Sequence, residues 1–471
     1  MTLMKDFGQM DQPNILWIFI EDMNDWMGCY GHTVVPTPNI DRLSYSGMRF
    51  DRAYMPAGVC SPSRSAVITG MYQTTIGAHH HRSSRSNFRG QNQGNYDAIH
   101  LPESVLTIPE RFRQAGYYTF IEGKTDYNFV FRSEDLYNHN NGKMGFKGAR
   151  SGSDWSGCPE GKAFFGQIHL TGGKQFGNPN LERVTDLSKV EVPPYYPDHP
   201  IIRDEIALHY DCVSHTDNEV GQILSKLDED DLLNNTIIFL FSDHGMRLPR
   251  HKQFIYQGGH KVPLIVADMK SSAPDCVKQN TVRTDLVSGI DISATSLALA
   301  NIEIPEQMEG NNLLAEEFQP RQFVVAAKDR CDYTIDRIRA IRTQKYGYLK
   351  NFMTDRPYMQ PQYRDGSNYM TLLHQMHANG ELNETQSAFW GVQRPVEELY
   401  DLEKDPHETI NLAYNPNYSS VLSEHRRILN NWIEESNDQG QYPESDIGLR
   451  CVLNRWGDKC INPEYAMLRK R

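Results

Sequence analysis

The chain has 471 residues, of which 39% are hydrophobic, and a formal net charge of −12 at pH 7. That length suits one large α/β domain with a smaller second domain, and the acidity argues against broad nucleic-acid binding. The longest apolar run, residues 15–20, is far too short to span a membrane. Because Met1–Lys5 has no apolar signal core, we expect a cytoplasmic protein, or a periplasmic or secreted one if a leader was removed.

Two continuous apolar runs, residues 14–20 and 236–242, predict central parallel strands that are covered on both faces. Carboxylates follow both runs. Between them, residues 108–116 predict a helix that ends at a glycine, and residues 117–121 predict a further strand. This alternation predicts a doubly wound, mostly parallel sheet, which binds its ligands beyond the carboxyl ends of the strands.

The pattern changes after about Phe318. Residues 337–343 and 346–352 predict paired short strands, and residues 421–435 predict a helix with an apolar core face. We therefore predict an α/β catalytic domain over residues 1–318 and a smaller antiparallel α+β subdomain over residues 319–471. The eight cysteines are too widely spread for a disulfide framework, and only Cys451 and Cys460 are spaced for a local bridge.

The segment Cys-Ser-Pro-Ser-Arg-Ser-Ala-Val-Ile-Thr-Gly, from Cys60 to Gly70, carries a nucleophile four residues before a cation. If a helix starts near Pro62, its free amides, its dipole and the Arg64 guanidinium converge on a sulfate or phosphate. A thiol at that place is expected to have a lowered pKa. The alternative is an inert, buried cysteine in front of an ordinary helix.

This segment resembles the C-x-P-S-R-x-x-x-hydrophobic-T-G signature of the type I sulfatases, which belong to the alkaline phosphatase superfamily. In that family the cysteine is oxidised to formylglycine after translation. The resemblance implies that formylglycine-generating machinery converts Cys60, and that one hydroxyl of the aldehyde hydrate attacks sulfur while the other expels sulfate. Residues 398–412 resemble a recurrent C-terminal motif of the same family, so the likeness extends over about residues 13–412. It implies a sheet of the alkaline phosphatase/sulfatase type.

The ends of the two predicted strands supply four groups that suit a divalent cation: Glu21, Asp22, Asp243 and His244. Carboxylate oxygens favour Ca²⁺, whereas the imidazole leaves Mg²⁺, Mn²⁺ and Zn²⁺ open. The resemblance implies that one metal is surrounded by these groups and by the hydrate formed from Cys60. Taken singly, each acidic pair is more typical of a loop or a helix cap.

Three lysines are singled out by the resemblance alone, since a lone lysine is usually exposed. Lys124 matches the lysine of the family's G-K-x-H motif, in which Asp126 replaces the histidine. Lys252 matches the lysine that bridges the sulfate and the nucleophile. Lys174 stands where a catalytic histidine is usual, with His169 inside the preceding strand. We expect Lys174 or His169 to complete a clamp with the other two lysines.

The acid that protonates the leaving oxygen is expected to differ from the usual histidine. A solvated Asp126 would be ionised and would repel sulfate, so we expect it to orient Lys124 or to bind a sugar hydroxyl. His260, or a histidine from the cluster at 79–81, is expected to donate the proton instead.

The segment 78–85 follows the Cys60 helix and is expected to line the substrate entrance, with cations that offset the acidity of the chain. The alternatives are that its histidines bind a metal, or that the segment is only a solvated loop. The substrate contacts that we predict are His79, His80, Arg82 and His260.

Similarity to bacterial polysaccharide sulfatases at residues 329–333 and 336–339 favours a sulfated polysaccharide or oligosaccharide as the substrate. An arylsulfatase and a phosphodiesterase or phosphonate monoester hydrolase of the same superfamily are alternatives. A protein of another class, which binds sulfated glycans while Cys60 stays a thiol, is also compatible with the sequence. We expect neither a nucleic-acid nor a membrane partner.

Overall fold

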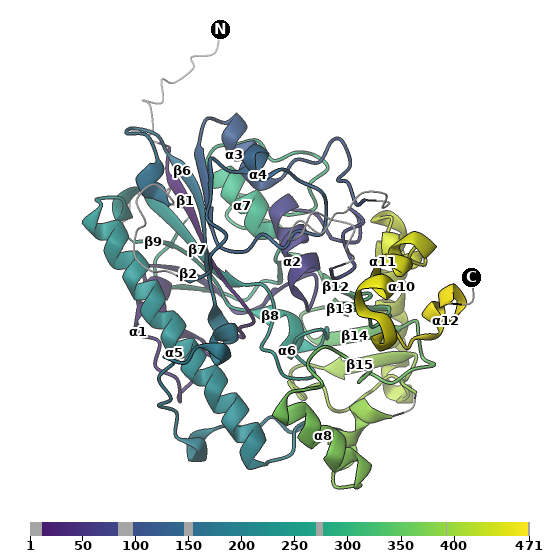
Figure 1. Ribbon diagram of the computed structural model, residues 1–471. Helices are drawn as coiled ribbons and strands as arrows, with labels where there is room; N and C mark the ends of the chain where they lie inside the picture. Colours follow the sequence, from purple (N-terminus) through teal and green to yellow (C-terminus); the bar gives the residue numbers. More distant parts are fainter. Residues whose placement is uncertain (1–11, 83–97, 146–153, 270–276, 392, 470–471) are drawn as a thin grey trace.

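The computed structural model describes residues 12–82, 98–145, 154–269, 277–391 and 393–469. A central sheet has helices on both faces, and a smaller sheet with its own helices lies against one side of it (Figure 1). The predicted α/β architecture is therefore confirmed. Residues 83–85, the end of the predicted entrance segment, lie outside the described residues.

The central sheet has eight strands in the order β10-β2-β9-β7-β1-β6-β4-β5. Neighbours from β7 to β5 are parallel, whereas β9 runs antiparallel to β7 and to β2. The predicted strands at 14–20 and 236–242 coincide with β1 and β7. The strands are β1 (Asn14–Ile20), β2 (Gly47–Phe50), β4 (Tyr118–Glu122), β5 (His139–Asn140), β6 (Phe164–Leu170), β7 (Thr236–Ser242), β9 (Leu264–Asp268) and β10 (Thr281–Arg283).

Strand β1 is apolar throughout because its alternate side chains enter two different cores. Leu16, Ile18 and Ile20 belong to one core, and residues 15, 17 and 19 belong to the other. The first core also contains side chains of two helices, α1 (Pro38–Tyr45) and α5 (Pro200–Glu229). The second contains side chains of α2 (Cys60–Thr69), α3 (Ile108–Gln114) and α7 (Asp291–Leu299).

The smaller sheet is antiparallel, with the order β12-β13-β14-β15, as the sequence predicts for the C-terminal part. The boundary between residues 318 and 319 stays a prediction. The elements of this part are β12 (Val324–Lys328), β13 (Ile338–Arg342), β14 (Tyr346–Asn351), β15 (Glu397–Asp401), α8 (Asn368–Ala378), α9 (Glu384–Ser387), α10 (Ser419–Glu435), α11 (Asp446–Trp456) and α12 (Pro463–Arg469).

Three very short strands, β11-β3-β8, form a third sheet: β3 (Ala53–Tyr54), β8 (Lys261–Val262) and β11 (Val287–Ser288). Neither Cys451 nor Cys460 forms a disulfide, so the expected local bridge is wrong. Their side chains enter the packed interior beneath α11 and α12 instead. Among the described residues, no helix combines the length and the apolar character that a membrane span requires.

The strand order explains how the site is assembled. The parallel strands β7, β1, β6 and β4 are adjacent, and their carboxyl ends lie at one edge of the sheet. The residues that follow them include Asp22, Lys124, Lys174 and Asp243, which are far apart in the chain. Parallel pairing therefore brings these charged groups together.

Candidate active site

Helix α2 begins at Cys60 and places its thiol at the edge of the sheet. The thiol is fully buried, with His244 Nε2 at 3.2 Å and the ammonium groups of Lys174 and Lys252 each at 3.6 Å from Sγ. Burial raises the pKa of the thiol and outweighs the opposite effect of Lys124 and Lys252. The expected lowered pKa is therefore wrong, because desolvation dominates at this helix end.

Asp22, Cys60, Asp243 and His244 gather at one point. Their ligand atoms all lie within 4.8 Å of one another, and all four residues are buried. The backbone of Asp22 has a φ of 51°, and its amide donates a hydrogen bond of 3.0 Å to Asp243 Oδ1. A non-glycine residue in this left-handed region is uncommon and indicates a backbone that the surroundings hold in place.

The imidazole of His244 is in the form that can ligate a metal. Burial lowers its pKa to about 4, so the ring is neutral at pH 7. Its Nδ1–H donates to the carbonyl of Gly245 at 2.8 Å, which leaves the lone pair of Nε2 aimed at Cys60 and Asp22. Two carboxylates and a neutral imidazole with a fixed tautomer fit a divalent cation.

Glu21 lies next to this group, and its carboxylate is surrounded by cations. It accepts hydrogen bonds from Arg64, from Lys174 and, at 3.2 and 3.3 Å, from Lys124. It is not among the four groups whose ligand atoms converge. Its predicted role as a metal ligand stays a prediction, whereas its contacts with the three cations are part of the structure.

Arg64 is completely buried and lies one helical turn after Cys60. It donates to Asp243 at 3.3 Å and to the carbonyl of Lys124 at 3.0 Å, and its guanidinium lies 4.2 Å from the centre of the Phe19 ring. This set of contacts fixes its orientation. The predicted proximity of Arg64 and Cys60 is therefore present, with the guanidinium held by carboxylates from two strand ends.

His169 supports Arg64 from inside β6. Its Nδ1 accepts from Arg64 Nη1 at 2.9 Å, and its Nε2–H donates to Gln167 Oε1 at 3.2 Å. Burial and the charge of Arg64 hold the pKa of this imidazole well below its ordinary value. Both ring nitrogens are engaged, so His169 positions Arg64 and has no proton to give to a substrate.

Lys174 reaches the site because glycines let its loop approach the backbone of β1. A Cβ at Gly173 would lie 2.2 Å from the carbonyl oxygen of Asp22, and Gly172 has a φ of 53°. The amide of Gly173 donates to the carbonyl of Glu21 at 2.8 Å. Only glycine permits this approach. The Lys174 side chain keeps 22% of its surface exposed.

Lys252 is the most enclosed of the three lysines, with 4% of its side chain exposed. It donates to both carboxylate oxygens of Asp22, at 2.7 and 2.9 Å. Two residues earlier in the chain, the Arg250 guanidinium lies 4.2 to 5.0 Å from the ring centres of Tyr195, Tyr256 and Phe389. These aromatic rings hold the backbone that carries Lys252.

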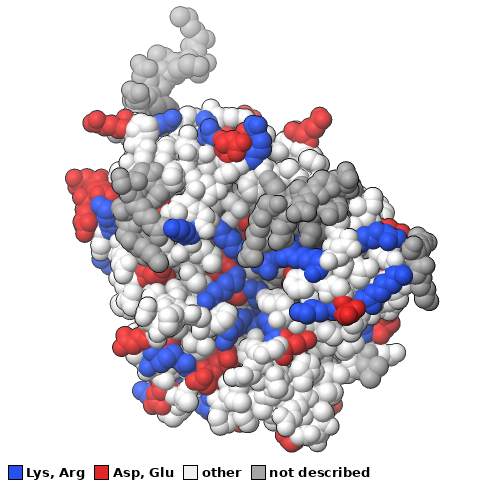
Figure 2. Space-filling view, in the orientation of Figure 1, with Lys and Arg blue, Asp and Glu red and all other residues white. Residues whose placement is uncertain are grey.

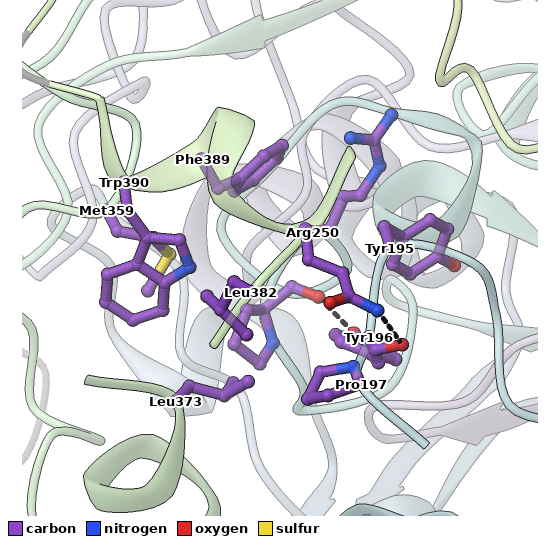
Figure 3. Close-up of a pocket in the computed structure, with 11 residues that line it drawn as sticks. Tyr195, Tyr196, Pro197, Arg250, Met359, Leu373, Leu382, Phe389 and Trp390 are labelled. Atoms are coloured by element: carbon purple, nitrogen blue, oxygen red, sulfur yellow. Dashed lines mark hydrogen bonds between the residues drawn. The ribbon is translucent and has the colours of Figure 1, made fainter. Parts of the chain in front are cut away.

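Figure 3 shows the pocket beside this aromatic cage, between Trp390, Leu373 and the two adjacent tyrosines. Its cavity volume is only about 20 Å³. About 10–15 Å³ of such space is needed for one water molecule, so this pocket holds about one water and no sugar. The pocket therefore belongs to the support of the Lys252 loop and is not a binding site for an organic ligand.

Asp126 is buried and forms an ion pair with Lys124 at 2.7 Å and a longer one with Arg82 at 3.6 Å. Burial alone would raise the pKa of this carboxyl, but the two cations outweigh burial and hold the pKa below its ordinary value. Asp126 is therefore ionised. Lys124, its closest partner, also donates to Glu21. The role of Asp126 in orienting Lys124 stays a prediction.

The remaining histidines lie behind the site. His260 accepts from Arg342 Nε at 2.6 Å and donates to the carbonyl of Met55 at 3.2 Å, so both of its nitrogens are engaged in the interior. This corrects the expectation that His260 protonates or binds the substrate. His81 pairs through Nδ1 with Ser61 at 2.9 Å.

Two other members of the entrance segment face the C-terminal part. His79 and His80 pack against each other, with ring centres 4.3 Å apart, and His80 lies 3.7 Å from Glu444. Each keeps 8% of its surface exposed. Among the described residues of this segment, Arg82 reaches the site through Asp126, with 23% of its side chain exposed.

Two functional residues escape sequence reasoning, Arg250 and Tyr363. Tyr363 lies close enough to Lys252, Asp22 and Cys60 for their charges to act on its phenol, although burial is the main cause of its raised pKa. No local pattern marks either residue, because their partners come from distant loops. In Figure 2, lysine and arginine side chains gather in the middle of one face and continue toward the side of α11 and α12, despite the net negative charge.

Comparisons with known proteins agree with this geometry. The family model "Sulfatase" matches residues 13–186 and 160–302. An ulvan-active sulfatase of Formosa agariphila is 32% identical over 482 aligned residues, which cover 93% of this chain and 77% of that protein. Human N-sulphoglucosamine sulphohydrolase is 26% identical, over 91% of this chain and 89% of its own length.

Among solved structures, a 2-O GAG sulfatase superposes with a TM-score of 0.66. The alignment covers 94% of this chain and 96% of that one, at 21% sequence identity. At this identity the likeness is one of fold. It extends over both the central sheet and the C-terminal part, which are thus arranged as in that protein.

The ion pairs of Asp126 lead to a test of stability. The folded pKa lies below the ordinary value of 3.8, so the carboxylate stabilises the protein above about pH 4, and this contribution is lost as the pH falls through the folded pKa. We expect Asp126→Asn to lower the free energy of unfolding by about 3 kcal/mol at pH 7 and by less below pH 4. Urea unfolding at several pH values measures the difference.

The control is Asp135→Asn, which removes a carboxylate from a solvent-exposed pair with Arg132. We expect this variant to unfold like the unaltered protein, because solvent screens such a pair. If Asp126→Asn lowers the free energy of unfolding equally at pH 7 and at pH 3, or does not lower it, the assigned ionisation of Asp126 is contradicted.

Proposed function

Because the chain belongs to the sulfatase family, we propose that it removes sulfate from a sulfated carbohydrate through a nucleophile made from Cys60. The observation that carries the proposal is the position of Cys60 at the start of α2, with two ammonium groups 3.6 Å from its sulfur and Arg64 one turn away. Amides of the helix start and these cations suit a sulfate group.

Formylglycine at position 60, made by the converting machinery, would supply a hydrate, one hydroxyl of which would attack sulfur and displace the sugar as its alcohol. The other hydroxyl would then lose its proton and expel sulfate, which restores the aldehyde. The raised pKa of the unmodified thiol supports this conversion, because a buried thiol at neutral pH is a poor nucleophile. Arg64, Lys124 and Lys252 orient the sulfate and offset the charge that builds up as the S–O bond breaks.

Substitution of Cys60 tests the nucleophile. We expect Cys60→Ala to fold normally and to lose roughly 10⁴-fold or more in kcat, as when other enzymes lose a nucleophile. Cys158→Ala, at a half-buried cysteine outside the site, is the control and should retain full activity. A peptide mass spectrum across Cys60 should show the aldehyde, and sulfate release by Cys60→Ala at the normal rate would refute the assignment.

We propose that one divalent metal, Ca²⁺ by preference, is held by Asp22, Asp243 and His244 together with residue 60 and Glu21. The convergent buried ligand atoms and the neutral imidazole of His244 support the site. The bound ion would polarise a sulfate oxygen and offset the charge of the carboxylates. Lys252, which contacts Asp22, would then be free to reach the sulfate.

Metal binding can be measured without turnover. We expect Ca²⁺ at about a hundredfold excess over its dissociation constant to add about 2.7 kcal/mol to the free energy of unfolding. Asp243→Asn should abolish this gain. Asp25→Asn, which removes a nearby carboxylate paired with Lys261, should keep it. A protein without metal that is fully active would contradict the site, whereas stoichiometric zinc would change only the identity of the ion.

We propose Lys174 as the acid that protonates the leaving oxygen. Of the histidines that we expected in this role, His260 is bound by Arg342, His81 by Ser61, and His80 lies beside Glu444. Asp126 is ionised. Lys174 is 3.6 Å from Cys60 Sγ and keeps 22% of its side chain exposed, whereas Lys252 is enclosed. The Lys174 side chain is thus partly open to solvent while its ammonium contacts the site.

The dependence on the leaving group tests this role. We expect Lys174→Met to reduce kcat on a sulfated oligosaccharide by about 10² to 10⁴, the usual range for a lost general acid. An activated aryl sulfate needs little protonation, so its turnover should fall much less. Lys252→Met is the matched control and should slow both substrates alike. An equal loss on both substrates for Lys174→Met would show that Lys174 only binds the sulfate.

The carbohydrate part of the proposal is supported by relatives. Proteins similar to this chain over most of its length are named for ulvan and for N-sulphoglucosamine. The cations across the middle of one face also suit a polyanionic chain (Figure 2). Release of sulfate from ulvan oligosaccharides, compared with phosphate monoesters and diesters, tests the substrate class against the phosphatase-like alternatives.

A further inference from the structure

The C-terminal part carries a cavity of about 350 Å³, open to solvent, that has no role in the reaction described so far. The loop that follows β14 and the link between α11 and α12 form its walls, with Tyr333, Gln362, Tyr363, Asp365, Lys459 and Ile461. Small-molecule sites in proteins have about 300–1,000 Å³, so the cavity has room for one hexopyranose residue.

Tyr363 connects this cavity with the site. It lines the cavity, and its phenol is also within range of the charges of Lys252, Asp22 and Cys60. The next residue, Arg364, ties the two loops together, because its Nη2 donates to the carbonyl of Lys252 at 3.1 Å and to Gln253 Oε1 at 2.9 Å. The cavity is therefore held at a fixed position relative to the nucleophile.

The walls combine apolar and polar surface in the way that sugars require. Tyr363 and Ile461 expose 38% and 62% of their surface, which offers apolar contact to the C–H face of a ring. Asp365 keeps 34% of its side chain exposed, and its Oδ2 accepts from the amide of Gln362 at 2.9 Å. This carboxylate can accept hydrogen bonds from sugar hydroxyls.

Lys459 supplies a positive charge at the other wall. Its ammonium lies 5.5 Å from the ring centre of Trp456, and its side chain is exposed. The Trp456 ring in turn packs on Tyr333, with ring centres 5.2 Å apart. A lysine beside an aromatic wall suits a sugar that carries a sulfate or a carboxylate.

We propose that this cavity is a sugar subsite that holds the residue next to the sulfated one, so that the protein acts on chains and not on single sugars. The proposal rests on the proposed function. The sulfated residue would lie over Cys60 and Tyr363, and the neighbouring anionic residue would enter the cavity between Asp365 and Lys459. The lysine and arginine side chains in Figure 2 extend in the same direction, toward α11 and α12.

The kinetic test compares chain length. We expect Lys459→Ala and Ile461→Asp each to raise KM for an ulvan tetrasaccharide about tenfold, the size of one lost charge-assisted contact, without changing kcat/KM on a small aryl sulfate. Lys404→Ala, at an exposed lysine elsewhere in the C-terminal part, is the control and should change neither. If both variants keep the normal KM for the tetrasaccharide, there is no subsite in this cavity.

A binding test separates this proposal from the proposed function. The Cys60→Ala protein cannot turn over, so calorimetry with the same tetrasaccharide measures binding alone. We expect Lys459→Ala in that background to weaken binding about tenfold. Equal binding overturns the subsite. If the unaltered protein binds the tetrasaccharide through Lys459 yet releases no sulfate from it, the proposed reaction fails and the subsite stands.

Discussion

Buried carboxylates at the end of the sheet require cations among them, and most of the structure around the site serves this requirement. Glu21, Asp22 and Asp243 are each at most 1% exposed. An uncompensated charge at such a depth costs several kcal/mol, so the folded state depends on the cations that surround these groups. Arg64 meets Glu21 and Asp243, and Lys252 meets Asp22. The candidate catalytic groups are therefore also the groups that make the sheet edge stable.

A second set of arginines, from the C-terminal part, holds the loops that carry these charges. Arg364 donates to the carbonyl of Lys252, Arg330 to that of His81 and Arg342 to that of Ile255. Each is buried, so the guanidinium needs acceptors on all sides and finds some of them on catalytic loops. The antiparallel sheet thus acts as a rigid support, and a change in its packing would shift the site although it holds no nucleophile.

The sequence predicts those features well that depend on residues close together in the chain. The runs 14–20 and 236–242 are apolar at every position but the ends, so their bounds follow directly, and Cys60 with Arg64 share one helical turn. In the sequence, His260 also looks like a candidate site residue. In the structure its side chain accepts a hydrogen bond from Arg342, which is 82 residues away. Its role depends on a contact that no local pattern records.

The cavity beside Tyr363 illustrates the same limit, since its walls come from residues 361–366 and 459–461. The thiol of Cys60 shows another: the helix start and the nearby cations were visible in the sequence, but burial decides the direction of its pKa shift. Spacing can be read from the sequence, whereas the burial of a side chain depends on packing against residues far away in the chain. Burial and the partners of charged groups were therefore the features that sequence reasoning predicted least well.

The charge balance of the site suits a sulfate monoester. Four cations, Arg64 and the three lysines, stand against the carboxylates of Glu21, Asp22 and Asp243, and the pair of Arg82 with Asp126 adds no net charge. These side chains leave an excess of one positive charge, and the divalent cation that we propose would add two more, so the site is positive overall toward the singly negative ester. A site with this balance attracts its substrate by a local field, while the acidic surface elsewhere, with a net charge of −12, keeps the protein from binding anions at random.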